Sequence, residues 1–300
     1  MSETATSATR PAAGAASPLG PRPDGAGRAQ HPSAAAGVVA DRDLLSVLAT
    51  DTRRRQAVVE VVIPVYNEEA GLEASIRRLH TYLTERFPLP WLITIADNAS
   101  LDRTWPIACR LVYELEGVHA VHLDTKGRGR ALRAAWTASP APVVAYMDVD
   151  LSTDLAHLPA LIDPLANNEA DLSYGTRLHR LSQTQRGFKR EFISRSYVFL
   201  LRTLAGLKVS DAQCGFKAIR RDAAHALVPL VKDTRWFFDS ELLLIAQENG
   251  YRLREVPVRW DEDTDTRVNI IATATEDLQG IWRLRVGGIP KVQRGADASR

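Results

Sequence analysis

Two carboxylates one residue apart follow an apolar run and are the clearest chemical signal in the sequence. Residues 143–147 are uncharged and mostly apolar, which predicts a buried parallel strand, and Asp148 and Asp150 come directly after it. Alternate strand residues point the same way, so both side chains are expected to reach one point at the carboxyl end of the sheet. Such oxygen ligands suit Mg²⁺ or Mn²⁺. The alternative is a pair of solvated turn aspartates.

A basic, glycine-containing stretch, Lys-Gly-Arg-Gly-Arg-Ala at 126–131, precedes that strand. Glycine lets the backbone approach an anion, and the helix predicted next offers unpaired N–H groups at its start. The spacing matches neither a P-loop nor a complete dinucleotide fingerprint. A phosphate contact and a plain basic helix cap therefore both stay open.

Three further segments carry charges that invite a chemical interpretation. Residues 180–195 are strongly basic and lead into an apolar helical stretch, which fits either a membrane interface holding a lipid phosphate or a core helix with a solvated start. Asp211 opens a compact segment ending at Lys217 and is either a general base or a turn cap. Asp239, at the start of an apolar helix, is interpreted as a partner of the helix dipole.

The elements that must position these residues alternate between strand and helix. Strands are predicted at 58–63, stopped by Pro64, and at 91–96 and 118–123, with helices through 72–83 and 107–115 between them. Two strand–helix units followed by a third strand predict an α/β fold with a mostly parallel sheet and right-handed crossovers. Later strands are predicted at 170–175 and 255–260.

Bulk composition is that of a soluble globular protein. The chain has 300 residues, of which 45% are hydrophobic and 25% charged, and its net charge of +2 gives no indication of nucleic-acid binding. Two cysteines without paired spacing argue for a reducing compartment and against a disulfide framework. No run of 18 apolar residues predicts a membrane span, and no signal peptide is recognisable. These features predict a cytoplasmic protein.

The domain organisation follows from composition. Residues 1–40, rich in Ala, Pro, Gly, Ser and Thr, are predicted to be a disordered tail because they cannot bury enough apolar surface. A short helical linker is predicted at 41–57, a single globular domain at 58–285, and a loose C-terminal tail at 286–300.

Six motifs in order along the chain resemble those of family 2 glycosyltransferases with the Rossmann-like GT-A fold. Segments 211–217, 236–247 and 255–260 are most similar to the dolichyl-phosphate β-glucosyltransferases, followed by the polyprenyl-phosphate mannosyltransferases. The motifs are Ile63-Pro64-Val65-Tyr66-Asn67-Glu68, Asp97-Asn98-Ala99-Ser100, Lys126-Gly127-Arg128-Gly129, Asp148-Val149-Asp150, Gly175-Thr176-Arg177 and Cys214-Gly215-Phe216-Lys217.

The resemblance implies roles for the matching positions. Asp148 and Asp150 would hold Mg²⁺ or Mn²⁺ on the pyrophosphate, and Asp150, Arg177 and Asp211 would be catalytic. The residues implied to bind the nucleotide are Pro64, Tyr66, Glu68, Asp97, Lys126, Gly127 and Asp148. The residues implied to receive the acceptor phosphate are Arg177, Arg190, Ser194 and Lys217.

Two departures from the family pattern stand out. Relatives usually have Asp-Asp-Gly-Ser where this chain has Asp97-Asn98-Ala99-Ser100, so the turn at this position is expected to differ. Many bacterial relatives continue into C-terminal membrane helices, and no such helix is predicted here. Attachment to a membrane is therefore expected to be peripheral, at the inner face, or through a membrane protein partner.

The resemblance implies an inverting transfer of a hexose, preferably glucose from UDP-glucose, to a polyprenyl or dolichyl phosphate. A phosphate monoester has a second pKa of about 6, so the acceptor needs positioning by Arg177 and Arg190 more than deprotonation. Three alternatives stay open: a GDP-mannose-dependent polyprenyl-phosphate mannosyltransferase, a transferase of the same fold that acts on a glycan or metabolite hydroxyl, and a non-catalytic nucleotide-sugar-binding partner.

Overall fold

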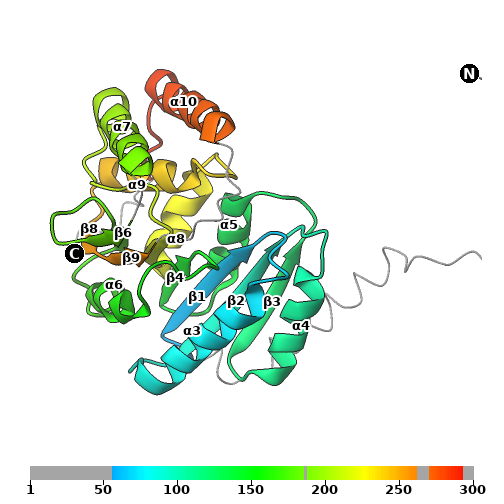
Figure 1. Ribbon diagram of the computed structural model, residues 1–300. Coiled ribbons are helices and arrows are strands. Elements are labelled where there is room, and N and C mark those ends of the chain that lie inside the picture. Colours follow the sequence, from blue (N-terminus) through cyan, green and yellow to red (C-terminus); the bar gives the residue numbers. More distant parts are fainter. Residues whose placement is uncertain (1–55, 186–187, 262–269, 293–300) are drawn as a thin grey trace, which may run out of the picture. The chain divides into compact units, whose positions relative to one another are not determined.

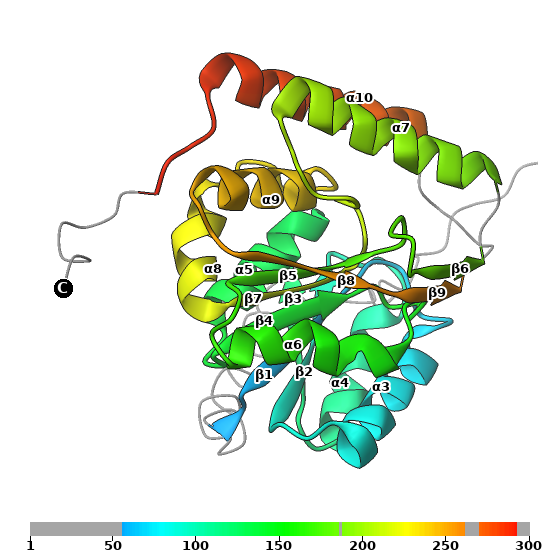
Figure 2. The same ribbon diagram turned by 90° about the vertical axis from the view of Figure 1, so that its left-hand side faces the viewer.

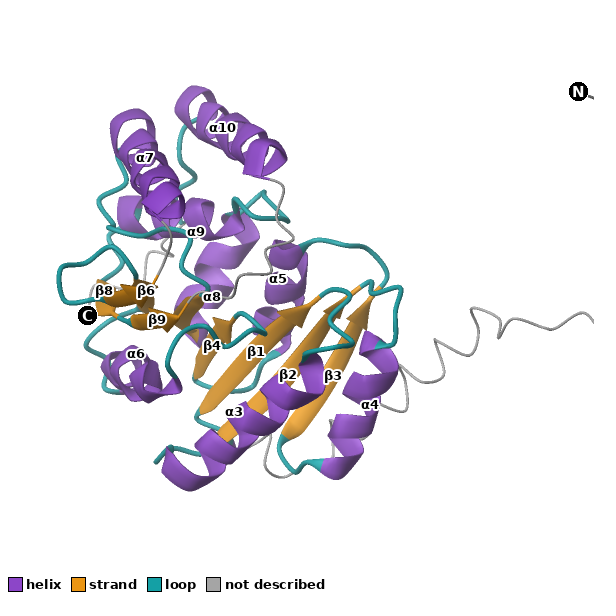
Figure 3. Ribbon diagram, in the orientation of Figure 1, coloured by secondary structure: helices purple, strands orange, loops and turns teal. Residues whose placement is uncertain are grey.

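The computed structural model describes residues 56–185, 188–261 and 270–292. Within them, seven strands form one sheet in the order β3-β2-β1-β4-β7-β5-β8 (Figures 1 and 3). All its strands run parallel except β7, which lies antiparallel between β4 and β5. The strands are β1 (Val59–Val65), β2 (Trp91–Asn98), β3 (Val118–Leu123), β4 (Val143–Met147), β5 (Leu172–Thr176), β7 (Phe216–Arg220) and β8 (Leu253–Pro257), and β6 (Gln183–Gln185) pairs separately with β9 (Arg259–Asp261).

Helices cover both faces of this sheet (Figure 2). One apolar cluster joins β1 and β4 to α3 (Leu72–Arg86), α4 (Thr104–Glu114) and α6 (Leu158–Ala166). A second cluster joins the opposite face to α5 (Arg128–Ala138), α8 (Arg221–Leu227) and α9 (Phe238–Glu248). Val61 and Ile63 face the first cluster and Val62 the second. Burial on both faces explains why the strands read as continuous apolar runs instead of alternating ones.

Helices α7 (Phe188–Ala205) and α10 (Ile270–Gly287) lie side by side on the outer side of α9 (Figure 2). Leu201, Ile281 and Leu284 are buried in the cluster that contains α9. Gly280 allows close approach, since a Cβ there would lie 2.3 Å from a ring carbon of Phe237. The helix pair is therefore packed onto the domain by an apolar face of its own.

The sequence predicted the element types well and some of their ends poorly. The strand at 118–123 and the helix through 72–83 are confirmed. The prediction that Pro64 stops the first strand is wrong, because β1 runs on to Val65. The pairing of β1 with β4 ends at Val62, so an N–H at position 64 is not required on that side. The second strand likewise continues to Asn98, and the late strand is divided into β8 and β9.

Other expectations are changed by tertiary contacts or stay predictions. The segment after Asp211 contains β7, which was not predicted because the sequence shows no apolar alternation there. Helix α10 reaches Gly287, beyond the predicted start of the loose tail at residue 286. None of the described helices is both long and apolar enough to cross a membrane. The predicted tail 1–40, the linker up to residue 55 and the last eight residues lie outside the described part, so the domain bounds stay predictions.

Candidate active site

The turn after β4 holds two acidic residues at the carboxyl end of the sheet. β4 ends at Met147, and the Leu151 N–H donates to the Asp148 carbonyl oxygen at 3.1 Å. The expectation that strand alternation aligns Asp148 with Asp150 is therefore wrong, since a tight turn and not the pleat sets their spacing. The Asp148 side chain is 45% exposed and Asp150 is exposed as well.

The two carboxylates have different surroundings. Nη2 of Arg128 donates to Oδ1 of Asp148 at 2.9 Å, and a Cβ on Gly215 would lie only 1.7 Å from Oδ2 of Asp148. Asp150 accepts a hydrogen bond from the Ser152 N–H at 3.0 Å. It also faces a cavity of about 390 Å³, whose lining residues are Arg78, Asp150, Leu151, Ser152, Asp154, Arg259 and Asp261.

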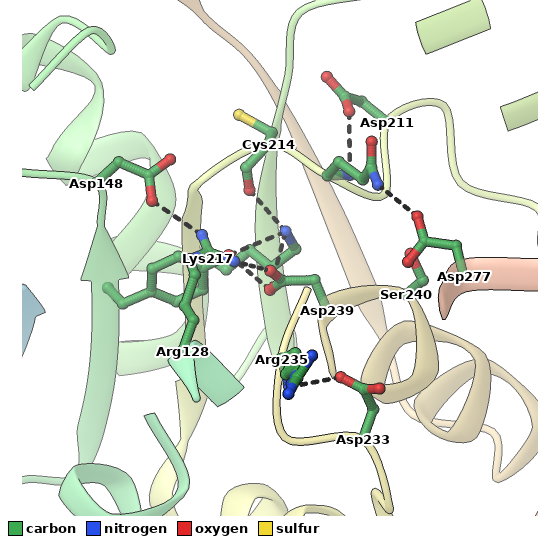
Figure 4. A network of polar contacts seen from close by, with 12 residues as sticks. Arg128, Asp148, Asp211, Cys214, Lys217, Asp233, Arg235, Asp239, Ser240 and Asp277 are labelled. Carbon is green, nitrogen blue, oxygen red and sulfur yellow. Dashed lines mark hydrogen bonds and ion pairs between the residues drawn. The ribbon is translucent and has the colours of Figure 1, made fainter. Parts of the chain in front are cut away.

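Behind Asp148, Arg128 joins a buried group of charges drawn from four elements (Figure 4). Arg128 of α5 pairs with both Asp148 and Asp239 of α9. Asp239 accepts from the Tyr146 hydroxyl at 2.5 Å and lies 3.2 Å from Nζ of Lys217. Burial alone raises the pKa of Asp239, but the charges of Lys217 and Arg128 bring it below its usual value. Asp239 is therefore ionised and holds Arg128 beside the acidic turn.

Two aromatic rings complete the surroundings of Arg128. Its guanidinium carbon lies 4.9 Å from the ring centroid of Tyr146 and 5.0 Å from that of Trp236. Cations are attracted to the faces of such rings, and a guanidinium presents several fixed donors to phosphate oxygens. A held positive charge next to Asp148 is suited to stabilise a diphosphate bound there.

A second buried ion pair lies at the end of β5. Nε and Nη2 of Arg177 donate to the two carboxylate oxygens of Asp211, at 2.8 and 3.0 Å, and the Arg177 N–H donates to the same carboxylate. Burial alone raises the pKa of Asp211, but Arg177 lowers it below the usual value, and in return Asp211 raises the pKa of Arg177. The charge of Asp148 also raises the pKa of Arg177, so Asp148 and Arg177 interact electrostatically.

The loops after β1 and β2 are tied together on the other side of the acidic turn. The Asn67 N–H donates to the Ser100 hydroxyl at 2.9 Å, and the Leu101 N–H returns a bond to the Asn67 side chain at 2.8 Å. The Glu68 N–H donates to the Thr104 hydroxyl at 2.8 Å. The loop that follows β1, Tyr66 to Glu68, is thus held in one conformation, and its side chains are half-buried, as is Pro64 at the end of the strand.

Asp97 lies at the base of this loop pair and is fully buried. Its Oδ2 is 2.7 Å from Nδ1 of His122, and its Oδ1 accepts a longer bond from the Ser100 N–H, at 3.3 Å. The His122 side chain is 32% exposed and packs against the Trp105 ring. Asp97 is therefore covered, and His122 is the side chain of this pair that solvent reaches.

Lys126 and Gly127 connect this region to the start of α5. Nζ of Lys126 lies 3.4 Å above the ring centroid of Tyr66. The Gly127 N–H donates to the Asn98 side-chain oxygen at 2.6 Å, and a Cβ at this glycine would lie 2.6 Å from the Thr234 carbonyl oxygen. Asn98 therefore fixes the basic loop whose anion-binding role the sequence left open.

Several predicted residues meet in this region and others do not. Arg177 pairs with Asp211, and Asp148 is bonded to the same segment through the Gly215 carbonyl oxygen. The prediction that Lys217 receives the acceptor phosphate is corrected, because this side chain is fully buried. It donates to the Cys214 carbonyl oxygen at 2.6 Å and pairs with Asp239, which leaves it no surface for an acceptor phosphate. Arg190 falls within α7, as does Ser194, but their side chains are outside the described residues and their roles stay predictions.

Sequence reasoning missed Tyr146 and Asp239 and underrated Arg128. Tyr146 reads as one more apolar strand residue, and Asp239 reads as ordinary helix-start chemistry, as interpreted above. Arg128 and Asp239 are 111 residues apart, so only the folded chain reveals their pairing. The single available signal was an acidic residue next to the aromatic run Trp236-Phe237-Phe238.

The sheet order, the antiparallel β7 and the acidic turn after β4 define the GT-A class of α/β folds. Residues 60–228 match the family model described as glycosyl transferase family 2, which covers more than half of the chain. The chain therefore belongs to glycosyl transferase family 2.

Curated relatives extend this similarity. Glycosyltransferase AglD from Haloferax volcanii is 35% identical over 242 residues, which is 79% of this chain and 38% of that protein. The dolichyl-phosphate beta-glucosyltransferase of Mus musculus is 27% identical over 252 residues, which is 76% of this chain and 78% of that protein. The chain spans 38% and 65% of the length of the first two relatives that it matches.

Solved structures agree on the fold. Glucosyl-3-phosphoglycerate synthase from Mycobacterium tuberculosis, in complex with uridine-diphosphate, superposes with a TM-score of 0.58 at 21% identity. The likeness covers 83% of this chain and 85% of that one. Another structure of that enzyme, with Mn²⁺, UDP-glucose and phosphoglyceric acid, gives a TM-score of 0.57 at 18% identity. At these identities the likeness concerns the fold alone.

Proposed function

We propose that this protein transfers a hexose, preferably glucose from UDP-glucose, to a polyprenyl phosphate with inversion at the anomeric carbon. The observation that carries the proposal is the bond that ties the acidic turn to the segment opened by the buried Arg177–Asp211 pair. The Asp148 N–H donates to the Gly215 carbonyl oxygen at 3.1 Å, and Asp211 lies four residues before Gly215 in the sequence. The family and the dolichyl-phosphate beta-glucosyltransferase relatives support it.

A divalent cation fits the residues of the acidic turn. Asp148 and Asp150 are accessible carboxylates two positions apart, and Gly215 leaves room for Asp148 where any side chain would collide with it. A cation held by these two carboxylates would take its remaining ligands from a diphosphate and water. A bound Mg²⁺ or Mn²⁺ would supply Lewis-acid stabilisation of the leaving nucleoside diphosphate.

The protein's own side chains would do the rest by positioning and charge. Arg128, fixed by Asp239, faces the diphosphate and stabilises the negative charge that develops on it. Arg177, with its side chain 13% exposed, directs the acceptor phosphate. An oxygen of that phosphate forms the new bond to the anomeric carbon while the bond from this carbon to the nucleoside diphosphate breaks.

The structure supports this assignment better than one that needs a strong general base. Both oxygens of Asp211 accept from Arg177, and its lowered pKa makes it a weak proton acceptor. A phosphate acceptor is already ionised at neutral pH and requires no proton removal. The buried ion pair thus fits a lipid phosphate better than a sugar hydroxyl.

Helices α7 and α10 support a peripheral position on a membrane. Leu278, Trp282 and Val286 are exposed, and their four-residue spacing puts them on one side of α10. The neighbouring α7 exposes Phe199, and the two helices also expose Arg195, Arg202 and Arg285. Apolar side chains flanked by arginines suit the interface of a membrane that contains anionic lipid. The inner face stays a prediction from the sequence.

A donor and acceptor panel tests the proposed function. Purified protein would be incubated with radiolabelled UDP-glucose or GDP-mannose, Mg²⁺ or Mn²⁺, and either dolichyl phosphate in vesicles or phosphoglyceric acid. We expect label in the lipid fraction with UDP-glucose and none in phosphoglyceric acid. Label only in the phosphoglyceric acid fraction, or no transfer with any pair, contradicts the proposal.

Substitutions in the acidic turn provide the matched control. Asp148→Asn and Asp150→Asn should each lower kcat/KM at least about 100-fold, because the Lewis-acid term is worth several kcal/mol. Asp154→Asn changes a carboxylate that lines the same cavity but caps the turn before α6, and it should retain activity. Equal activity of all three variants would exclude a cation held by the first two residues.

A further inference from the structure

Asp277 is a buried carboxyl that the proposed function does not use. It lies on α10, is 1% exposed, and its Oδ2 accepts a hydrogen bond from Nε2 of Gln213 at 3.1 Å (Figure 4). By distance, its Oδ1 makes no hydrogen bond within the described residues, although the Tyr197 hydroxyl lies near enough to lower the pKa of the carboxyl by hydrogen bonding. A carboxyl group buried with so few hydrogen bonds is costly, which indicates a function beyond packing.

Gln213 connects this carboxyl to the acceptor side of the site. Its side chain donates to Asp277, while its main-chain N–H donates to Oδ1 of Asp211 at 3.2 Å. The same oxygen accepts from Nη2 of Arg177. Gln213 therefore joins α10 to the Arg177–Asp211 pair.

We propose that Asp277 is a positioning residue, which sets the Arg177–Asp211 pair relative to the α7–α10 helix pair by holding Gln213. The inference rests on the proposed function, in which that ion pair directs the acceptor phosphate and the helices lie at the membrane. The proposed role is to fix a relative position: the helices that contact the lipid and the arginine that contacts the phosphate are held at a constant distance and orientation.

The surroundings of Asp277 make this link depend on protonation. Burial raises the pKa of Asp277 to about 7, the Tyr197 hydroxyl partly opposes this, and the charges of Asp233 and Glu276 add to it. The other ionisable groups around the junction are Asp239 near Tyr197, Arg235 paired with Glu276, and Glu241 paired with Arg283. Above neutral pH the carboxyl is ionised in a buried position among other acids.

The sign of the effect follows from linkage. The folded state keeps a proton that the unfolded chain releases near pH 4, so stability falls as pH rises from about 4 to 7 and then levels off. Asp277→Asn cannot ionise and should lack this fall. Compared with the wild type, the variant should therefore gain in urea midpoint between pH 5 and pH 8.

Hydrogen exchange of the full chain without substrate tests the link itself. In the wild type, amides of residues 213–217 should gain protection between pH 6 and pH 8 after correction for intrinsic exchange, because an ionised carboxylate accepts the Gln213 hydrogen bond more strongly. Asp277→Asn should show equal protection at both values, and Gln213→Ala should be poorly protected at both. Gln279→Ala, an exposed residue of the same helix, serves as the control and should behave like the wild type.

Kinetics then separate the two proposals. Gln213→Ala should raise the acceptor KM about fivefold, the size of one neutral hydrogen bond, and leave the donor KM unchanged. Adding Asp277→Asn to it should cause no further loss, because both act through one contact. Identical protection in the wild type, Asp277→Asn and Gln213→Ala overturns the positioning role. The expected protection pattern without transfer to any lipid phosphate upholds the link and contradicts only the proposed function.

Discussion

At the scale of single residues, burial decides what each carboxylate of the site can do. Asp211 and Asp239 are covered and each is ionised against a neighbouring cation, while Asp148 and Asp150 remain accessible. Ion pairing inside the protein satisfies the first two. The two accessible carboxylates are the ones that a ligand from solvent can reach, although all four are plain aspartates in the sequence.

Asp211→Asn should lower the free energy of unfolding by about 3–5 kcal/mol, because it leaves Arg177 buried without its charge partner. The lowered pKa of Asp211 also means that its stabilisation is present above pH 4 and is lost as the pH falls below its folded pKa. The variant should lack that acid-dependent loss. Urea unfolding between pH 2.5 and pH 7 measures both effects.

Asp222→Asn is the matched control for that experiment. Asp222 pairs with Arg220 on the surface, with its side chain 68% exposed, so its loss should cost less than about 1 kcal/mol. If Asp211→Asn and Asp222→Asn lower the free energy of unfolding equally, burial does not determine how much the Arg177–Asp211 pair stabilises the protein. Activity of Asp211→Asn alone cannot identify a general base, since the substitution also releases Arg177.

The sequence predicted which residues meet in the site better than it predicted their roles. Asp148, Arg177 and Asp211 follow strand ends or lie in motifs, so sheet topology alone brings them to one edge. Lys217 was assigned to the acceptor because exposure cannot be read from a motif. Its partners Tyr146 and Asp239 are 71 and 22 residues away, and only the packing of β7 against β4 and α9 brings them together.

At the scale of elements, the turn after β2 carries a backbone conformation that its residue disfavours. Ala99 has a φ of 61°, the left-handed region, at the position where relatives usually have glycine. The alanine at this position therefore adds strain to the turn. The surrounding bonds between Asn67, Ser100 and Leu101 hold the turn despite that strain.

Ala99→Gly should stabilise the protein by about 0.5–1 kcal/mol, since relief of about 1–2 kcal/mol exceeds the entropy that glycine loses on folding. Ala134→Gly, at an exposed position inside α5, should instead destabilise it by about 1 kcal/mol. Thermal and urea unfolding of the two variants gives both values. Destabilisation of similar size at the two positions would show that Ala99 is not strained.

Element boundaries were harder to predict than element types for a related reason. The ends of β1 and β2 depend on which neighbouring strand is present, and Pro64 is tolerated because β4 no longer pairs at that point. Strand β7 escaped prediction since it is only five residues long and is placed by partners on both sides. Local propensity contains no information about such neighbours.

At the scale of the whole molecule, the exposed faces of α7 and α10 predict reversible binding to anionic membranes. Trp282→Glu should weaken vesicle binding by about 10- to 100-fold, because burying such a side chain is worth about 1.5–3 kcal/mol and a carboxylate repels anionic lipid. Sedimentation with vesicles that contain phosphatidylserine measures this.

Tyr113→Glu is the control for membrane binding, because Tyr113 is 87% exposed but belongs to α4 on the opposite face of the sheet. Its vesicle affinity should equal that of the wild type apart from the effect of one added charge. If both variants lose affinity equally, attraction by net charge explains the binding and the helix pair does not form the membrane surface.

The position of β7 also governs when the site can come into existence during synthesis. Strand β4 leaves the ribosome early, yet its neighbour on one side is supplied by residues 216–220, about 70 positions later. Until then β4 and β5 have no hydrogen-bonding partner between them, and Asp148 has no Gly215 beside it. The half of the sheet formed by β3, β2, β1 and β4 can therefore assemble before β7 places Gly215 beside Asp148, and β8 is added to the sheet last.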